Sequence, residues 1–228
     1  MADDATRAGG RYGNPAIHQL LEEIYCDPDP AFSDALLTLE RSGMPRIQVS
    51  AEDGRILKLL MRLAGAKKVV EFGTLSGYSA LWLLAGMEPD GKLWTLEREP
   101  AHAEAAGGVF QRAGVADRIT LLVGDGRDCL DSMAQEGPFD AVFLDADKEG
   151  YETYARWALA HLRPGGLLLM DNAYLFGLLA EDDEEHAAAR ASVLATHRLL
   201  AENFVATCIS TPDGLAVGMK LPHEEDRK

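Results

Sequence analysis

Three side chains with oxygen donors follow two apolar segments of this 228-residue chain, at the points where those segments end. Asp145 follows the segment that begins at Phe139, and Asp171 and Asn172 follow the one that begins at Gly166. Oxygen ligands without histidine or cysteine suit Mg²⁺, Mn²⁺ or Ca²⁺. Three of them leave room in an octahedral shell for two substrate oxygens and a water. A lone aspartate at a strand end is more often a helix cap, so this metal-site prediction depends on two neighbouring strand ends.

A glycine-rich segment follows an earlier apolar run and has the sequence EFGTLSGYS, from Glu71 to Ser79. Its glycines allow a tight turn and the close approach of a ligand. The segment is not G-x-G-x-x-G, because Leu75 occupies the position of the second glycine. A dinucleotide pyrophosphate is therefore not its favoured ligand. The Glu71 carboxylate would repel phosphate and suit a cationic group such as an amino-acid ammonium.

Two later segments extend this candidate cofactor site. Glu97 ends the apolar segment that begins at Lys92, a position where acidic side chains accept hydrogen bonds from ribose hydroxyls. Gly124-Asp125-Gly126 is another segment that allows the close approach of a ligand. Each glycine taken alone fits an ordinary turn between strand and helix equally well. Together these segments favour a ligand with a ribose, an adenine and an ammonium but no phosphate, a description that S-adenosylmethionine fits.

The elements that position these residues follow from an alternation of patterns. Short apolar segments alternate with longer helical patterns, which is typical of βαβ units and a parallel sheet. The last two apolar segments, 204–210 and 214–220, flank a Thr-Pro-Asp turn and predict a hairpin with at least one antiparallel strand. We therefore expect a doubly wound α/β sheet of about seven strands, with its ligands at the carboxyl ends of the strands.

Helical patterns also precede the first strand. Segments 15–26 and 31–41 are amphipathic and predict a helical appendage within 15–45. Ser50 can cap a third helix, with Asp53 as the return carboxylate of a capping box. For the whole chain we expect a flexible tail over 1–14, a single domain over 15–221 and a polar tail over 222–228.

The composition argues against several partners. The chain has 22 Lys and Arg against 37 Asp and Glu, a formal net charge of −15, whereas nucleic acids and anionic membranes require a basic face. No stretch reaches 18 apolar residues, so no membrane span is expected. Cys26, Cys129 and Cys208 are widely spaced, which argues against a disulfide framework and a zinc site. With a polar N-terminus, they predict a cytoplasmic protein.

Three motifs together make the chain resemble the cation-dependent S-adenosylmethionine O-methyltransferases, which include caffeoyl-CoA and catechol O-methyltransferases and bacterial relatives. The motifs are EFGTLSGYS, LDADKEGYETY and the DN pair after the fifth strand. The resemblance runs from about Pro15 to Lys220 and includes IQVSAEDGRIL and PDGLAVGMK. It implies a Rossmann-like class I methyltransferase fold: a mostly parallel seven-stranded sheet, a C-terminal antiparallel hairpin strand and extra N-terminal helices. It also implies a homodimer.

The resemblance further implies roles for individual residues. Asp145, Asp171 and Asn172 would bind the metal, and Lys148 and Asp145 would be catalytic, with Lys148 as general base. S-adenosylmethionine would contact the residues that match the family's cofactor positions, namely Val49, Glu71, Gly73, Thr74, Ser79, Glu97, Gly126, Asp145 and Asp147. The acceptor would be a small ortho-dihydroxyaryl compound. Its oxygens would bind the metal, which lowers the hydroxyl pKa before the oxyanion attacks the sulfonium methyl in line.

The segment after the DN pair departs from the family pattern, in which DN-x-L-W-x-G is common. Leu175 replaces the tryptophan, and Phe176 replaces the polar residue before Gly177. This apolar wall favours a hydrophobic aryl acceptor, and Tyr174 either stacks on its ring or simply packs. The acidic segment 181–185 is interpreted as a solvated loop that disfavours polyanionic acceptors such as CoA thioesters.

Two other functions fit the same general pattern less well. A nucleotide-binding oxidoreductase would need a phosphate-binding glycine triplet, and it gives no reason for Asp145, Asp171 and Asn172 to converge. A non-catalytic S-adenosylmethionine-binding protein would be expected to lack Lys148 or a metal ligand, and all are present. The six histidines are scattered and are interpreted as structural or surface residues. An O-methyltransferase is therefore the expected function.

Overall fold

The structure is a computed structural model that describes residues 14–27, 29–182 and 184–222. Two compact units divide the chain, Met1–Pro30 and Ala31–Lys228. The first unit contributes one described helix, α2 (Pro15–Ile24). The predicted tails fall almost entirely on residues 1–13 and 223–228, which lie outside the described residues.

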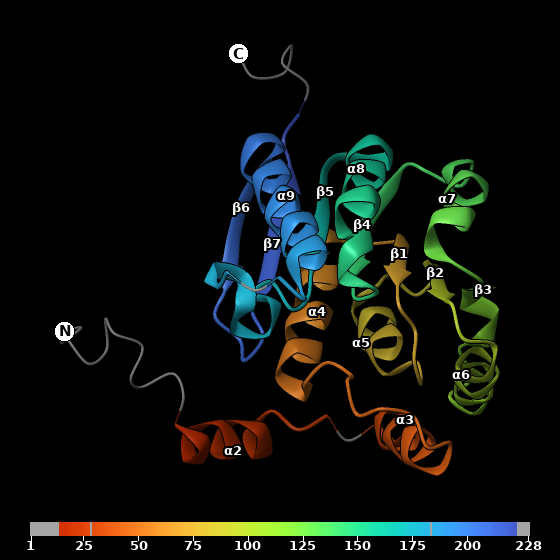
Figure 1. Cartoon of the computed structure of the whole chain (residues 1–228). Coiled ribbons are helices and arrows are strands. Elements are labelled where there is room, and N and C mark those ends of the chain that lie inside the picture. The colour runs from red at the N-terminus through yellow and green to blue at the C-terminus, as the bar shows by residue number, and fades with distance from the viewer. Residues whose placement is uncertain (1–13, 28, 183, 223–228) are drawn as a thin grey trace. The chain divides into compact units, whose positions relative to one another are not determined.

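Strands and helices alternate through the second unit (Figure 1). The strands are β1 (Lys68–Phe72), β2 (Lys92–Glu97), β3 (Ile119–Val123), β4 (Phe139–Leu144), β5 (Leu162–Met170), β6 (Phe204–Ile209) and β7 (Leu215–Lys220). The helices are α3 (Pro30–Arg41), α4 (Ala51–Ala64), α5 (Tyr78–Gly86), α6 (Pro100–Arg112), α7 (Gly126–Ala134), α8 (Tyr151–His161) and α9 (Ala187–Asn203). Short 3-10 turns are η1 (Ala116–Arg118), η2 (Lys148–Gly150) and η3 (Leu175–Ala180).

One sheet joins the seven described strands in the order β3-β2-β1-β4-β5-β7-β6. Strands β1 to β5 are parallel, and β7 runs antiparallel to both β5 and β6. The mostly parallel, doubly wound sheet with a C-terminal antiparallel strand is therefore confirmed. The chain winds from β1 outward to β3 and then returns to β4 on the other side of β1. The carboxyl ends of β1 and β4 thus flank the switch point, where open α/β sheets bind ligands.

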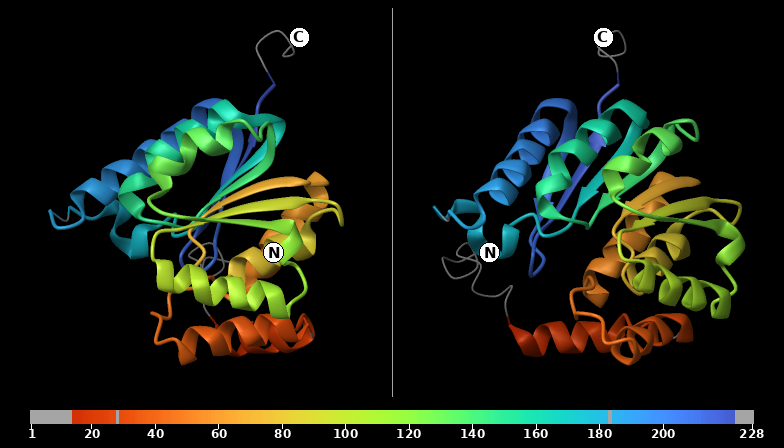
Figure 2. Two further views of the ribbon diagram at one scale, coloured as in Figure 1. Left: turned by 90° about the vertical axis from the view of Figure 1, so that its right-hand side faces the viewer. Right: turned by 45° about the vertical axis from the view of Figure 1, so that its right-hand side comes forward.

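Alternate side chains of the central strands face two helical layers, which Figure 2 shows on opposite faces of the sheet. Val69 and Phe143 belong to a core cluster with residues of α4, α5 and α6. Their chain neighbours Val70 and Val142 belong to a second cluster with residues of α7, α8 and α9. Both faces are covered, so the parallel strands are apolar at nearly every position.

Two predicted details of these elements need correction. Asp53 does not complete a standard capping box: Ser50 Oγ accepts the Asp53 N–H at 3.0 Å, but the Asp53 carboxylate accepts the Ser50 hydroxyl at 2.6 Å instead of a backbone N–H. Strand β5 begins at Leu162 and not at Gly166 as expected, because a register irregularity against β4 accommodates the intervening Pro164-Gly165 pair.

The helical appendage divides between the two units. Helix α3 contributes the buried Phe32, Ala35 and Leu39, and Phe32 stacks on Trp82 of α5 with ring centroids 3.9 Å apart. This helix therefore packs in the core of the unit that contains the sheet. Within the described part of the chain, none of the helices has the length and apolar character needed to cross a membrane.

Candidate active site

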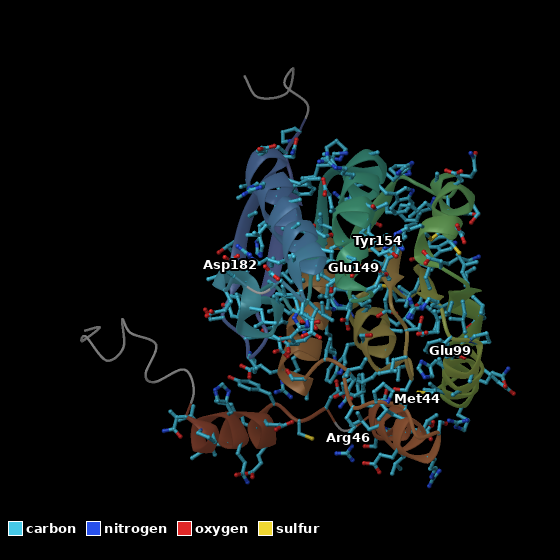
Figure 3. All side chains as sticks on the ribbon, viewed as in Figure 1. Met44, Arg46, Glu99, Glu149, Tyr154 and Asp182 are labelled. Carbon is cyan, nitrogen blue, oxygen red and sulfur yellow. The ribbon has the colours of Figure 1, made fainter. Side chains whose placement is uncertain are left out.

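A cavity of about 880 Å³ opens at the carboxyl ends of the parallel strands. Loops after β1, β2, β3, β4 and β5, the segment before α4 and the β6–β7 turn all contribute to its lining. Tyr154 on α8 and Glu99, just before α6, both line it and are labelled in Figure 3. Its size is in the range of natural small-molecule sites.

Glu71 lies beneath this cavity, fully buried at the end of β1. Its Oε2 accepts the Thr95 hydroxyl at 2.6 Å, whereas its Oε1 has no hydrogen-bond partner among the described residues. Burial raises the pKa of Glu71 from 4.5 to about 8, although the nearby Ser79 and Thr95 side chains oppose the rise. A buried carboxylate oxygen without a partner is costly, so a cationic ligand group would relieve it.

Thr74 continues this hydrogen-bond chain to the wall of the cavity. Its Oγ1 lies 2.6 Å from Thr95 Oγ1. The single Thr95 hydroxyl proton goes to Glu71, so Thr74 must be the donor to Thr95. The Thr74 oxygen then keeps acceptor capacity toward the cavity that it lines.

Glu97, at the end of β2, is held by backbone amides of the glycine-rich loop. Its Oε2 accepts the N–H groups of Thr74 at 3.3 Å and Leu75 at 2.8 Å, and its Oε1 accepts the N–H of Glu99 at 2.9 Å. His102 Nδ1 lies 3.7 Å from the same Oε1. The carboxylate lines the cavity in a fixed orientation, with lone pairs to spare for hydroxyl donors.

Two glycines of the predicted cofactor site, Gly73 and Gly126, lie so close to other protein atoms that a larger residue would not fit. Gly73 has φ +99°, and a Cβ there would lie 2.1 Å from the backbone oxygen of Asp145. At Gly126 a Cβ would lie 2.9 Å from the hydroxyl oxygen of Tyr154. We expected these glycines to allow a ligand to approach. Both line the cavity, but a side chain at either position would first collide with other atoms of the protein.

Asp147 links the loop after β4 to the start of α7. Its Oδ1 accepts the Tyr154 hydroxyl at 2.9 Å, and its Oδ2 lies 2.7 Å from Arg127 Nη2. The other nitrogen of the same guanidinium lies 3.5 Å from Asp125. Asp147 therefore ties two loops of the cavity together, in addition to facing it.

Asp145 and Asp171 lie side by side because β4 and β5 are neighbours. The backbone N–H of Asp145 donates to Phe72 of β1 at 2.8 Å, and that of Asp171 donates to Leu144 of β4 at 3.0 Å. Asn172 follows with φ +49°, a left-handed conformation that asparagine tolerates better than most residues. Asp171 and Asn172 are buried, and Asp145 and Asn172 line the cavity.

Negative charge accumulates around these two carboxylates. Burial, together with the charge of Asp145, raises the pKa of Asp171 to about 8. The pKa of Asp145 is also raised by burial, against the opposing effect of Lys148, whose Nζ lies 3.2 Å from Asp145 Oδ1. Asp53 adds to both shifts. It is buried, and its Oδ1 has no partner in the described structure.

A cation fits this donor set. Two carboxylates and an amide are hard oxygen ligands, and the charge of Lys148 alone does not balance Asp145, Asp171 and Asp53. Within the described ranges, however, no group of three His, Cys, Asp or Glu side chains is arranged to hold a metal. The set therefore depends on the Asn172 amide as its third protein ligand.

The remaining wall of the cavity is apolar. Phe176, in a left-handed conformation with φ +55°, is 60% exposed and lines the cavity together with Ile47. Leu175 is buried in the core, so only one of the two expected wall residues faces the cavity. Tyr174 packs on Gly214, where a Cβ would lie 2.8 Å from its ring, and it is not part of the lining.

Most of the predicted site residues meet at this cavity. Its lining includes Gly73, Thr74, Ser79, Glu97, Gly126, Asp145, Asp147, Lys148 and Asn172. Glu71 and Asp171 lie buried behind it, and Val49 is buried in a core cluster beside the lining residue Gln48. The described residues of the acidic segment 181–185 are exposed and do not contribute to the lining.

Several residues of the site were not predicted from the sequence. Asp53 was interpreted only as a cap, His102 as structural or surface, and Asp213 only as part of a turn. Asp213 lines the cavity and contributes to the raised pKa of Asp145. Gln48 and Ser76 line the cavity with buried side-chain oxygens that lack partners among the residues described. The periodicity of α4 was the available signal for Asp53, because it places this carboxylate on the buried face with Leu57.

Comparison with known proteins agrees with this geometry. The sequence model of a family described as O-methyltransferase matches residues 32–221. The chain belongs to the O-methyltransferase family. A catechol O-methyltransferase from Mycobacterium tuberculosis is 43% identical over 176 residues, covering 77% of this chain and 80% of that protein. Another from Niastella koreensis is 38% identical over 177 residues, with the same coverage.

Solved structures of other O-methyltransferases have the same fold. TomG from Streptomyces achromogenes, solved in complex with SAM, has a TM-score of 0.84 and 33% identity, covering 91% of this chain and 96% of that one. Family membership identifies the chain as an enzyme that transfers a methyl group to oxygen. It decides against both the oxidoreductase and the non-catalytic alternatives.

Proposed function

We propose that this O-methyltransferase uses S-adenosylmethionine and a divalent cation to methylate a hydroxyl of a small ortho-dihydroxyaryl acceptor. One observation carries the proposal: a single cavity joins Glu97 and the glycine-rich loop to Asp145, Lys148 and Asn172. The relatives named catechol O-methyltransferases and the SAM-bound structure of TomG support the acceptor class and the cofactor.

The cofactor would lie along the ends of β1, β2 and β3. The partnerless Glu71 Oε1 suits its ammonium, and the fixed Glu97 carboxylate suits its ribose hydroxyls. The N-terminus of α5, which begins at Tyr78, favours the negative charge of its carboxylate. S-adenosylmethionine has no phosphate, and a site with acidic side chains such as Glu71 and Glu97 suits a ligand of this kind.

The cation would be held by Asp145, Asp171 and Asn172. Mg²⁺ is the expected ion, and Mn²⁺ and Ca²⁺ use the same oxygen ligands. When bound, it supplies Lewis acidity, which makes an acceptor hydroxyl easier to deprotonate.

Lys148 is the proposed general base. Its side chain is 15% exposed at the cavity wall, and its Nζ is held by Asp145. The amine takes the hydroxyl proton of the acceptor. The acceptor oxygen then forms a bond to the methyl carbon, the carbon–sulfur bond breaks, and its electron pair stays on sulfur as S-adenosylhomocysteine. Alignment of the two reactants can supply on the order of 7–11 kcal/mol.

The acceptor ring would lie against Phe176 and Ile47, both of which are largely exposed at the cavity. This wall favours an uncharged or apolar substituent on the ring. We further propose a cytoplasmic homodimer. The dimer follows from the family resemblance and is tested by light scattering after size exclusion. The cytoplasmic assignment follows from the sequence, whose three widely spaced cysteines do not suit a disulfide framework.

The test is methyl transfer from labelled S-adenosylmethionine to catechol, with Mg²⁺, with EDTA, and with EDTA followed by excess Mg²⁺. We expect transfer to stop with EDTA, to return with Mg²⁺, and to be lost in Asp171→Asn, which removes one carboxylate without changing its size. Transfer that survives both EDTA and the substitution would contradict the cation-dependent mechanism. S-adenosylhomocysteine binding without transfer to any catechol would leave the cofactor site intact and refute the acceptor class.

A further inference from the structure

Tyr151, the first residue of α8, places its hydroxyl at the meeting point of three groups of the site. Its side chain is fully buried. The Tyr151 hydroxyl oxygen lies 2.6 Å from Lys148 Nζ, 3.2 Å from the Leu144 carbonyl oxygen and 3.3 Å from the Asp171 carbonyl oxygen. These carbonyls belong to the ends of β4 and β5, so the hydroxyl spans the strand ends that carry Asp145 and Asp171.

The direction of each hydrogen bond follows from the donors available. The carbonyl oxygens can only accept, so the single hydroxyl proton of Tyr151 is directed to them. The Tyr151 oxygen must then accept a hydrogen bond from an N–H of Lys148. Lys148 Nζ also donates to Asp145 Oδ1 at 3.2 Å, and it lies 4.7 Å from the centre of the Tyr151 ring.

These two acceptors determine where a lone pair on Lys148 can point. A neutral amine has two N–H donors and one lone pair in a tetrahedral arrangement. Tyr151 and Asp145 take the two N–H groups, which leaves the lone pair in the third direction. Lys148 lines the cavity whereas Tyr151 is sealed in the core, so that direction is toward the cavity.

We propose that Tyr151 is a positioning residue, whose hydroxyl directs the lone pair of Lys148 at the acceptor hydroxyl. This inference rests on the proposed role of Lys148 as general base. Without the Tyr151 oxygen, Asp145 is the one acceptor left to Lys148 among the residues that the structure describes, and the lone pair can rotate away from the cavity. The loss should therefore affect proton removal and leave cofactor binding unchanged.

The test compares Tyr151→Phe with wild-type enzyme on two acceptors, at saturating Mg²⁺. Catechol must lose a proton to the enzyme, whereas a nitrocatechol assayed above its own pKa arrives already ionised. We expect Tyr151→Phe to lower kcat with catechol on the order of 10-fold or more, because general base catalysis typically supplies 10²–10⁴. The rate with ionised nitrocatechol should stay within about threefold, and the KM for S-adenosylmethionine should not change.

Two further variants make the outcome decisive. Lys148→Met should show the same preference for the ionised acceptor, and adding Tyr151→Phe to it should cause no further loss, because the tyrosine acts through the lysine. Tyr154→Phe removes another hydroxyl of α8, one that bonds Asp147. It should change the rates with both acceptors in the same proportion. S-adenosylhomocysteine affinity and thermal unfolding establish that each variant is folded.

Equal losses of Tyr151→Phe on both acceptors, or no loss with catechol, would overturn the proposal. If Lys148→Met is impaired with catechol and Tyr151→Phe is not, only the positioning role fails. If Lys148→Met methylates catechol at the wild-type rate, the general base itself is refuted, and the role of Tyr151 with it.

Discussion

Replacing Glu71 by glutamine should change how the stability of the ligand-free enzyme depends on pH. In the folded protein burial raises the pKa of Glu71 to about 8 from an ordinary 4.5. Between these values the folded state holds a proton that the unfolded chain has lost. Raising the pH therefore removes a proton from the folded state at a cost, and stability falls as the pH approaches 8.

The magnitude follows from linkage. From pH 6 to pH 8 the folded protein holds on average nearly one proton more than the unfolded chain at this group. At 1.36 kcal/mol per pH unit, this lowers the free energy of unfolding by about 2 kcal/mol. Glutamine cannot ionise, so Glu71→Gln should lose about 2 kcal/mol less than wild-type enzyme over the same interval. Asp171, with a pKa of about 8, titrates in both proteins and cancels from the difference.

Urea unfolding at pH 6 and pH 8, in EDTA and without cofactor, measures this difference directly. Equal pH dependence of the two proteins would refute the reasoning, because it would mean that Glu71 is already ionised in the fold. A companion titration follows proton release when S-adenosylhomocysteine binds at pH 7. The ammonium of the ligand favours ionised Glu71, so wild-type enzyme should release a large part of one proton and Glu71→Gln none from this site.

Other substitutions test the remaining parts of the site. Gly73→Ala should lower the free energy of unfolding in urea by more than about 2 kcal/mol, because its Cβ meets the Asp145 backbone oxygen and its φ is +99°; unchanged stability would contradict the close contact of the two loops. Asp53→Asn should weaken Mn²⁺ binding by about tenfold in calorimetry, since it removes a buried charge that acts on Asp145 and Asp171. The neighbouring Glu52→Gln serves as the charge-matched control, and equal effects of both would indicate a general charge effect. Phe176→Ala should raise the KM for an apolar catechol about threefold to tenfold and leave that for S-adenosylmethionine unchanged, because the ring lines the cavity on the side proposed for the acceptor.

Local patterns predicted the fold well because each carries its own physical cause. The alternation of short apolar segments with helical patterns was sufficient to imply the sheet, and β2 has the predicted bounds, Lys92–Glu97. Asp145 and Asp171 could be paired in advance because parallel neighbours end at the same edge of a sheet. Side chains that reach the site from outside the strand ends were harder to predict. Asp53 comes from α4 and Asp213 from the β6–β7 turn, and no local pattern places either one near β4.

The roles of single side chains depend on contacts that spacing does not encode. Leu175 and Phe176 are adjacent and both apolar, yet one is in the core and the other is at the cavity, because left-handed conformations at both residues turn the chain. Tyr151 belongs to a motif that was used only for recognition. Its proposed function depends on hydrogen bonds to two main-chain carbonyl oxygens. Every residue has such a carbonyl, so the sequence does not indicate which of them the hydroxyl meets.

The close approach of Gly73 to the Asp145 backbone places the loop after β1 directly against the loop after β4. A movement of one backbone segment is therefore felt by the other, without any side chain between them. In the proposed mechanism this contact would link the occupancies of the cofactor and cation sites, and thermodynamics requires that each ligand then alter the affinity of the other by the same factor.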